Sequence, residues 1–297
     1  GDYLRVMNEQ MERFFDIEPY HTYRDYFNVS TAIAVSPESG IGTVNTIRNT
    51  KFETTFTGEV GLRGNYSTIF NYAMEVSPVD ESNLNQSLII VTPNTIDYGG
   101  ITEMWTDGSA IAFCPLSEDS YPYDARGIIQ HEAGGHGFGK LGDEYIYHNT
   151  FIDFCDCTCC EHVFEFNIAK SLGWYENLSL TGKMHEVPWS HLIFDDRYSD
   201  VVDIYEGGFM HARGVFRSEQ NSCMNNNISY YNAISREAIV KRIMEYAGES
   251  YSFEKFVEND KRDAVNSLSR SAERPGVTVR GNQYAPRIHK GKPDILK

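Results

Sequence analysis

One stretch of this 297-residue chain decides how the rest is interpreted, and it reads His131-Glu132-Ala133-Gly134-Gly135-His136-Gly137-Phe138-Gly139-Lys140-Leu141-Gly142-Asp143-Glu144-Tyr145. It combines two histidines, a glutamate beside the first of them, and two acidic residues after a glycine-rich exit. Imidazole nitrogens and carboxylate oxygens are among the ligand atoms that zinc takes in proteins. The stretch therefore predicts a metal site built on a helix.

The spacing of the two histidines departs from the usual zinc-binding helix, in which the ligands are four residues apart. At 3.6 residues per turn, residues four apart are separated by about 40° around the axis, whereas residues five apart are separated by about 140°. His131 and His136 are five apart, so one extra residue must be absorbed by a π-bulge. Gly134-Gly135 is where the backbone is freest to form that bulge, which would return both imidazoles to one face.

A third ligand and a base complete the predicted site. Catalytic zinc takes three protein ligands and keeps one position open for water. Gly139 lets the chain leave the helix and turn back, which brings Asp143 within reach as the third ligand, with Glu144 as the alternative. Either carboxylate could instead orient a ligand histidine through a hydrogen bond. Glu132 is expected to lie near the water and to act as its general base.

Hydrophobic periodicity and turn residues outline the elements around this site. We predict helices over residues 3–15, 125–139, 161–172 and 235–247, the second capped by Asp124 and the fourth by Ser235. Strands are predicted over residues 27–35, 88–91 and 109–113. This order indicates an α+β (mixed α/β) fold. We expect residues 1–140 to hold the sheet and zinc helix, residues 141–261 to form a C-terminal subdomain, and residues 262–297 to form a surface tail.

Composition argues against nucleic acid and membranes as partners. The formal net charge of −16 disfavours nucleic acid and anionic membranes, which would repel this chain. A hydrophobic content of 41% is ample for a buried core, yet no run approaches the roughly 18–20 apolar residues that span a bilayer. We therefore expect neither a nucleic-acid partner nor a membrane span.

Six cysteines are unevenly distributed. Four of them lie in one Cys-x-Cys-x-Cys-Cys stretch at residues 155–160, while Cys114 and Cys223 stand alone. Residues that close seldom have the Cα separation of about 5.5 Å that a disulfide prefers. Bridges from this stretch to Cys114 or Cys223, free thiols and a second, thiolate-bound metal all remain open from the sequence.

The stretch 131–145 resembles the family of bacterial metallopeptidases named after immunoglobulin A peptidase, which are metzincin-like zinc peptidases. The likeness extends over most of residues 14 to 260, through landmarks that follow in order: Tyr98-Gly99-Gly100, Tyr205-Glu206-Gly207-Gly208, Gly214-Val215-Phe216-Arg217, Ser222-Cys223-Met224 and Ser235-Arg236. The resemblance implies a zinc peptidase domain with a twisted sheet, an active-site helix and a loop-rich C-terminal subdomain.

The resemblance also implies roles for single residues. Met224 would be the methionine of a tight turn beneath the metal, a packing floor and not a ligand. Metzincin-like enzymes often carry a tyrosine two residues later, where this chain has Asn226. The strand at residues 109–113 would border the cleft and pair with an extended peptide. The candidate substrate or oxyanion contacts are Tyr145, Arg217, Tyr230 and Tyr231.

By this resemblance the chain is expected to be a zinc-dependent endopeptidase that acts on an extracellular protein or peptide. An extracytoplasmic bacterial address is expected too, secreted or surface-anchored, with the signal segment outside this chain. Two alternatives stay open. One is a dipeptidyl-peptidase type of zinc enzyme, whose third ligand would be a later glutamate: Glu161, Glu165 or Glu186. The other is a catalytically silent module that binds protein or glycan.

Overall fold

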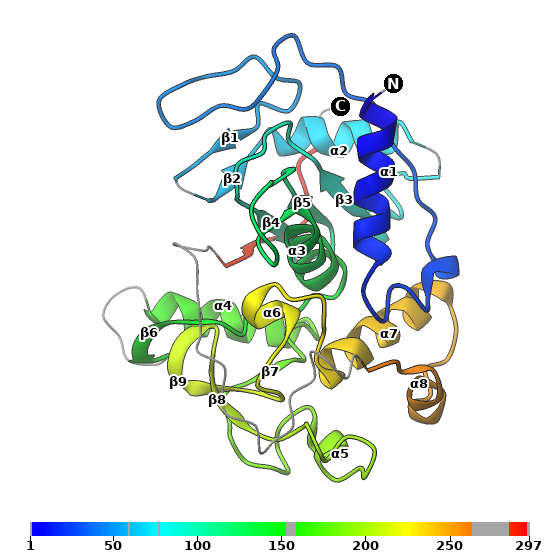
Figure 1. The fold of residues 1–297 in the computed structure, drawn as a ribbon, viewed down its shortest axis with the longest axis vertical. Coiled ribbons are helices and arrows are strands. Elements are labelled where there is room, and N and C mark those ends of the chain that lie inside the picture. Colours follow the sequence, from blue (N-terminus) through cyan, green and yellow to red (C-terminus); the bar gives the residue numbers. More distant parts are fainter. Residues whose placement is uncertain (1, 59, 77, 153–158, 263–284, 296–297) are drawn as a thin grey trace. The chain divides into compact units, whose positions relative to one another are not determined.

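The fold is known from a computed structural model, which describes residues 2–58, 60–76, 78–152, 159–262 and 285–295 (Figure 1). Its residues pack into two compact units. Unit 1 contains Gly1–Phe14, Phe27–Phe138 and Arg280–Lys297, and unit 2 contains Phe15–Tyr26 and Gly139–Val279. Helices and mixed sheets occur together, which confirms the α+β class predicted from the sequence.

Unit 1 is organised around a four-stranded mixed sheet with the order β10-β4-β5-β3. Strand β4 runs antiparallel to β5, while β3 is parallel to β5 and β10 is parallel to β4. A separate pair, β1 and β2, is antiparallel. The strands are β1 Thr55–Phe56, β2 Leu62–Arg63, β3 Leu88–Val91, β4 Ile101–Trp105, β5 Ala110–Phe113 and β10 Arg287–His289.

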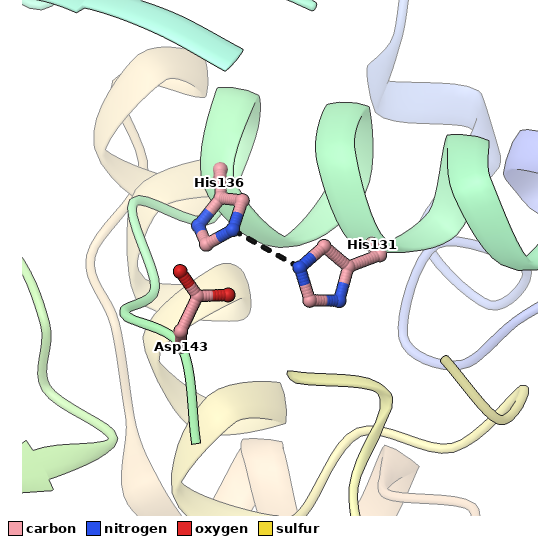
Figure 2. Close-up of side chains that lie close together, drawn as sticks. All are labelled: His131, His136 and Asp143. Carbon is pink, nitrogen blue, oxygen red and sulfur yellow. Dashed lines mark hydrogen bonds between the residues drawn. The ribbon is translucent and has the colours of Figure 1, made fainter. Parts of the chain in front are cut away.

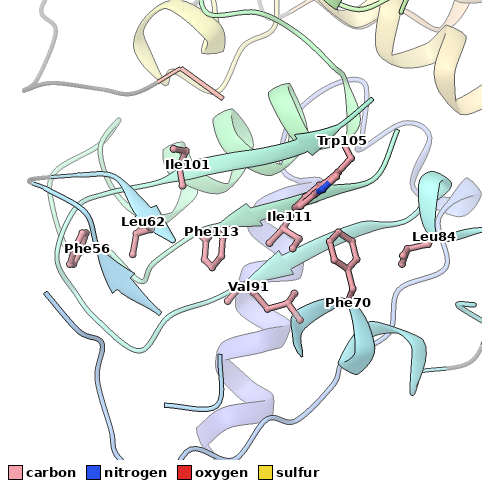
Figure 3. Packing of buried hydrophobic residues seen from close by; sticks show 10 residues of the cluster. Phe56, Leu62, Phe70, Leu84, Val91, Ile101, Trp105, Ile111 and Phe113 are labelled. Carbon is pink, nitrogen blue, oxygen red and sulfur yellow. The ribbon is translucent and has the colours of Figure 1, made fainter. Parts of the chain in front are cut away.

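Every residue of β4 and β5 is buried, so both faces of the sheet are covered at its centre. The hydrophobic core cluster lies against one face (Figure 3), and the ring of Phe70 packs edge-on to Trp105 with centroids 4.9 Å apart. Burial of each such side chain stabilises the fold by roughly 1.5–3 kcal/mol. The cluster consists of Phe56, Leu62, Ile69, Phe70, Leu84, Val91, Ile101, Trp105, Ile111 and Phe113.

The helix predicted over residues 125–139 packs against β4 and β5. It begins as an α-helix and continues as a π-helix to Phe138, so the single π-bulge expected at Gly134-Gly135 is one part of a longer π-helical run. The helix predicted over residues 3–15 is also confirmed. The helical elements of unit 1 are α1 Asp2–Phe15, α2 Tyr66–Met74, η2 Leu84–Gln86, α3 Ala125–Ile129 and η3 Gln130–Phe138.

Unit 2 combines a small sheet with several helices. Strand β9 is its centre, because β6 pairs with it in parallel and both β7 and β8 pair with it antiparallel. The strands are β6 Ile146–Phe151, β7 Leu178–Ser179, β8 Tyr205–Gly208 and β9 Met210–Arg217. The helices are η1 Arg24–Tyr26, α4 Cys159–Ser171, α5 Ser190–Ile193, α6 Cys223–Asn226, α7 Ala233–Ala247 and α8 Phe253–Asn259.

Two strand predictions need correction. Residues 27–35 form no strand, because β-branched residues supply propensity whereas a strand also needs a neighbour for its backbone groups. The strand predicted at residues 109–113 exists as β5, but it is an interior strand with β4 on one side and β3 on the other. It therefore has no open edge for an extended peptide, and the predicted pairing of substrate with this strand is wrong.

One helix cap also differs from the prediction. The helix expected to begin at Ser235 begins at Ala233, because the Asn232 side chain accepts a hydrogen bond from the Ser235 backbone N–H at 3.1 Å. Asparagine is among the strongest N-cap residues, and here it precedes the serine.

The predicted surface tail is wrong for one described part of it. Arg287–His289 form β10, whose residues pair with Glu103, Met104 and Trp105 of β4. The fully buried Glu103 carboxylate lies 2.9 Å from Arg287 Nη1 and 2.7 Å from His289 Nε2. A buried carboxylate requires such partners, which explains why these basic residues join the sheet. Residues 263–284 and 296–297 lie outside the described part.

The predictions for the cysteines are only partly addressed. Cys114 and Cys223 are buried and form no disulfide, so the bridges considered from the sequence to these two residues are absent among the described residues. The cysteine-rich stretch at residues 155–160 lies outside the residues whose side chains are described. Among the described helices, none has the length and hydropathy needed to cross a membrane.

Candidate metal centre

The helix that carries the candidate ligands is fixed at its start and along its length within unit 1. Asp124 caps it, because its carboxylate accepts a hydrogen bond from the Gly127 backbone N–H at 3.0 Å. The Gln130 side chain donates to the backbone carbonyl of Arg13 in α1 at 2.9 Å. These contacts place residues 131–138 in one orientation against the sheet.

His131 and His136 meet on one side of this helix. Their Nε2 atoms lie 3.1 Å apart, and their rings are nearly perpendicular at 83°. Both are buried, with 4% and 1% of their surface exposed. Hydrogen bonds from residue i to residue i+5 lengthen the turn of a π-helix, so residues five apart share a face. The π-helical backbone therefore brings His131 and His136 to a shared face, as their five-residue spacing required.

The third residue of this group is Asp143, which follows the helix and has no exposed surface. Ligand atoms of His131, His136 and Asp143 all lie within 4.8 Å of one another (Figure 2). Within unit 2, the Asp143 backbone carbonyl accepts a hydrogen bond from the Phe209 N–H at 2.8 Å. The side chain is thus carried by a fixed backbone.

This donor set fits a zinc ion. Zinc–nitrogen bonds of about 2.0–2.1 Å in a tetrahedral site place two ligand nitrogens about 3.3 Å apart. The observed separation of 3.1 Å between His131 Nε2 and His136 Nε2 is close to that value. Two imidazoles and one carboxylate also leave a fourth position open, as catalytic zinc sites do. The three residues could therefore hold a metal.

Glu132 lies between the two histidines in sequence and packs against the start of β4. Only 9% of its surface is exposed. The hydroxyl of Thr102 lies 2.9 Å from Glu132 Oε2 and 2.8 Å from the Glu132 backbone carbonyl oxygen. The residue before β4 is Gly100, and a Cβ atom there would lie 3.0 Å from Glu132 Cγ. The carboxylate thus occupies a defined place beside the strand.

Cys114 lies near the same carboxylate, and its surroundings favour the protonated thiol. Burial raises the pKa of its thiol well above the usual range, and the nearby charge of Glu132 raises that pKa further. The thiolate is the reactive form of cysteine, so a thiol held protonated is inert.

Glu144, the alternative ligand, is engaged elsewhere. Its Oε1 atom accepts hydrogen bonds from the side-chain amides of Asn177 and Asn232, both at 2.8 Å. Burial raises the pKa of its carboxyl to about 7, although the two amides and the Arg217 charge oppose that rise. The one potential metal-binding group among the described residues includes Asp143 and does not include Glu144.

Met224 is fully buried in the short helix α6 of unit 2. Its backbone carbonyl accepts a hydrogen bond from the Glu144 N–H at 2.7 Å, which ties α6 to the residue after Asp143. Asn226, at the position where metzincin-like enzymes often carry tyrosine, donates from its side chain to Asn221 Oδ1 at 2.6 Å. The turn is therefore connected to the ligand segment through its backbone.

The four candidate substrate contacts are buried within unit 2. Arg217 donates to the backbone carbonyls of Glu206 and Gly207 at 3.2 and 2.7 Å, so its guanidinium supports strand β8. Tyr145 packs edge-on against Tyr147.

The other two tyrosines also have partners. Tyr230 donates to Glu219 at 2.7 Å, and Tyr231 packs edge-on against Tyr20. These contacts show what holds each side chain, and a role of any of the four toward substrate stays a prediction.

The later glutamates of the alternative site are placed differently. Glu161 and Glu165 are exposed residues of α4. Glu186 is exposed and pairs with Lys183, whose Nζ lies 2.9 Å from its carboxylate. Within the part of the chain that the structure describes, the only potential metal group is that of His131, His136 and Asp143.

Three polar residues of these sites were not identified from the sequence. Thr102 contacts Glu132, while Asn177 and Asn232 bind Glu144. A cap signal was available for Asn232, because asparagine before a helical run is a recognised start. Thr102 and Asn177 lie 30 and 33 residues from their partners, and no local pattern marks them.

Comparison with known proteins adds one match. The family model described as IgA Peptidase M64 matches residues 1–170, which is more than half of the chain. This range includes the candidate metal centre and ends before the landmarks at residues 205–236. No curated protein matches the sequence.

Proposed function

We propose that the chain is a zinc-dependent endopeptidase with Glu132 as its general base. The premise is that it belongs to the IgA peptidase M64 family and is therefore a metallopeptidase, which hydrolyses peptide bonds. The observation that carries the proposal is the pair of buried Nε2 atoms 3.1 Å apart, with the carboxylate of Asp143 in the same group. We infer that His131, His136 and Asp143 hold the zinc, in a metzincin-like arrangement with Met224 below the site.

Zinc in such a site acts as a Lewis acid toward a scissile carbonyl and makes water more acidic. The chain's own part in the reaction is proton transfer. Glu132 would accept a proton from the attacking water on its carboxylate and deliver it to the amine that leaves. Its position between two ligand residues in sequence, with 9% of its surface exposed, supports this role.

The substrate class follows from the same chemistry. A peptidase acts on protein or peptide, and we propose an extracellular protein as the natural substrate. By its resemblance to secreted bacterial peptidases, we also propose an extracytoplasmic address, secreted or surface-anchored. The family's name refers to immunoglobulin A, but the residues of the site specify no particular sequence to be cut.

The decisive experiment combines metal analysis with turnover of an unfolded protein. We expect about one zinc per chain, and a Glu132→Gln variant that keeps the zinc but loses roughly 100- to 10,000-fold in kcat. Glu81→Gln, at an exposed position, is the matched control and should leave both unchanged. Near-normal turnover by Glu132→Gln would refute the role of Glu132.

The ligand set is tested separately. His136→Ala and Asp143→Ala should each lose the zinc, because three ligands are needed to hold it. Zinc that survives Asp143→Ala would move the third ligand to Glu144 or to a later glutamate. No metal in the purified protein, even after zinc is resupplied, would overturn the zinc assignment and favour a catalytically silent binding module.

A further inference from the structure

The carboxylate of Glu132 lies against Gly100, which precedes β4, and Thr102, the second residue of β4. We propose that both are positioning residues: Thr102 holds the Glu132 side chain through its hydroxyl, and Gly100 leaves the space into which the carboxylate fits. The inference rests on the proposed role of Glu132 as general base. It concerns contacts inside unit 1 alone.

Thr102 is well suited to fix another side chain. It is fully buried, and its backbone pairs with Ala112 of the interior strand β5. A β-branched side chain is stiff at χ1, so the hydroxyl has a defined direction. The single O–H of Thr102 is shared between two acceptors, the carboxylate and the backbone carbonyl of Glu132, whose oxygens lie 2.9 and 2.8 Å from its Oγ1. Thr102 thereby links the carboxylate of Glu132 to the backbone of the same residue, which fixes the direction of the Glu132 side chain.

The relevant feature of Gly100 is that it has no Cβ atom. A Cβ at this position would lie 3.0 Å from Glu132 Cγ and 3.1 Å from Glu132 Oε1, with Ile128 Cγ2 at 3.2 Å. The Gly100 backbone is itself held, because its N–H donates to the Val60 carbonyl at 3.0 Å. A Cβ atom here would require the Glu132 side chain to shift by a few tenths of an ångström from its present place.

A general base works only when its carboxylate is correctly placed. Proton transfer requires hydrogen-bond reach, and a displacement of about 1 Å can reduce a rate by roughly 100-fold. A displaced Glu132 would therefore reduce kcat while substrate binding and metal retention stay intact. A merely structural role for Thr102 would instead reduce thermal stability or the amount of folded protein.

The test compares Thr102→Val, Thr102→Ser and Gly100→Ala in the full zinc-loaded chain. We expect Thr102→Val to lower kcat roughly 10- to 100-fold, with KM within about twofold of the wild type. Thr102→Ser keeps the hydroxyl and should restore most of kcat. Gly100→Ala should lower kcat by less, roughly 3- to 10-fold, because a Cβ there displaces Glu132 by only a few tenths of an ångström. Thr54→Val, a buried threonine before β1, is the matched control and should keep kcat.

Zinc content and melting temperature are measured on every variant. Equal kcat for Thr102→Val and Thr102→Ser, or a loss confined to KM, zinc content or melting temperature, would overturn the proposal. If Thr102→Val does not fold, the kcat of Gly100→Ala decides, and a wild-type value there refutes the inference. Glu132→Gln distinguishes failure of the proposed function from failure of this inference. If Glu132→Gln stays active, Glu132 is not the general base and both proposals fail. If Glu132→Gln is inactive while Thr102→Val is fully active, only the positioning proposal fails.

Discussion

Replacing Asn232 should destabilise unit 2 through two contacts that one side chain makes at once. Its Oδ1 caps helix α7, accepting from the Ser235 N–H at 3.1 Å, and its Nδ2 donates to Glu144 at 2.8 Å. Loss of an N-cap costs about 1 kcal/mol. Loss of a hydrogen bond to a buried charged group costs about 2 kcal/mol. We therefore expect Asn232→Ala to lower the free energy of unfolding by about 3 kcal/mol.

Two further variants separate the contributions. Asn232→Ser keeps a capping oxygen but lacks the amide donor, so it should lose about 2 kcal/mol. Asn232→Asp keeps the cap and places a second carboxyl against Glu144, whose pKa burial has already raised to about 7. Two facing carboxylates repel, whereas a protonated pair can share a hydrogen bond. Asn232→Asp should therefore be least stable above pH 7 and recover as the pH falls below that value.

Urea unfolding followed by tryptophan fluorescence measures these differences through the shift in midpoint at constant slope. Asn167→Ala, at an exposed position of α4, is the matched control and should change stability by less than about 0.5 kcal/mol. The reasoning would be refuted if Asn232→Ser were as stable as the wild type. That result would mean that the amide bond to Glu144 contributes nothing.

Three shorter predictions follow from other contacts. Gly137→Ala would place a Cβ atom 2.5 Å from Leu88 Cδ1, so it should lower the free energy of unfolding by about 1–3 kcal/mol. Adding Leu88→Ala to the same chain should recover part of that loss, as measured by urea unfolding in a double-mutant cycle. Burial opposes ionisation of Glu237, but the hydrogen bond from His191 and the charge of Lys241 outweigh it and leave the pKa below its usual range. The resulting stability is fully present above the unfolded pKa and is lost as pH falls through the lower folded value, so Glu237→Gln should destabilise at pH 7, and thermal melts should show that cost shrinking as the pH is lowered further into the acid range. Chelation should lower the melting temperature of the wild type, because a metal that binds the native state stabilises it, and an unchanged melting temperature would contradict a resident metal.

Much of the candidate metal centre could be predicted from residues 131–145. The five-residue spacing of His131 and His136 is incompatible with a shared face on a regular α-helix, and the adjacent glycines indicate where the helix departs from it. The observed π-helix follows from the same argument, although it spans Gln130–Phe138 and not a single bulge. The helix shape at residues 130–138 therefore follows from the local spacing of its residues.

The sheet was less predictable, because strand pairing depends on partners far away in the chain. Residues 27–35 have a strand-like composition without a described partner, while the short, basic stretch at residues 287–289 becomes a strand beside β4. The interior position of β5 likewise follows from its two neighbours and not from its own residues. Propensity states what a segment tolerates, and the neighbouring backbone decides whether the segment is used as a strand.

The sequence by itself determined the helix, the candidate ligand residues and the acidic pair that follows them, since all depend on spacing within a few turns. Only the tertiary structure decided what surrounds those groups. Thr102 reaches Glu132 across 30 residues, and Asn232 reaches Glu144 across 88 residues. Hydrogen bonds act over about 3 Å in space, whatever the separation along the chain. The division between the two carboxylates, Asp143 grouped with the histidines and Glu144 bound by amides, therefore arises from packing.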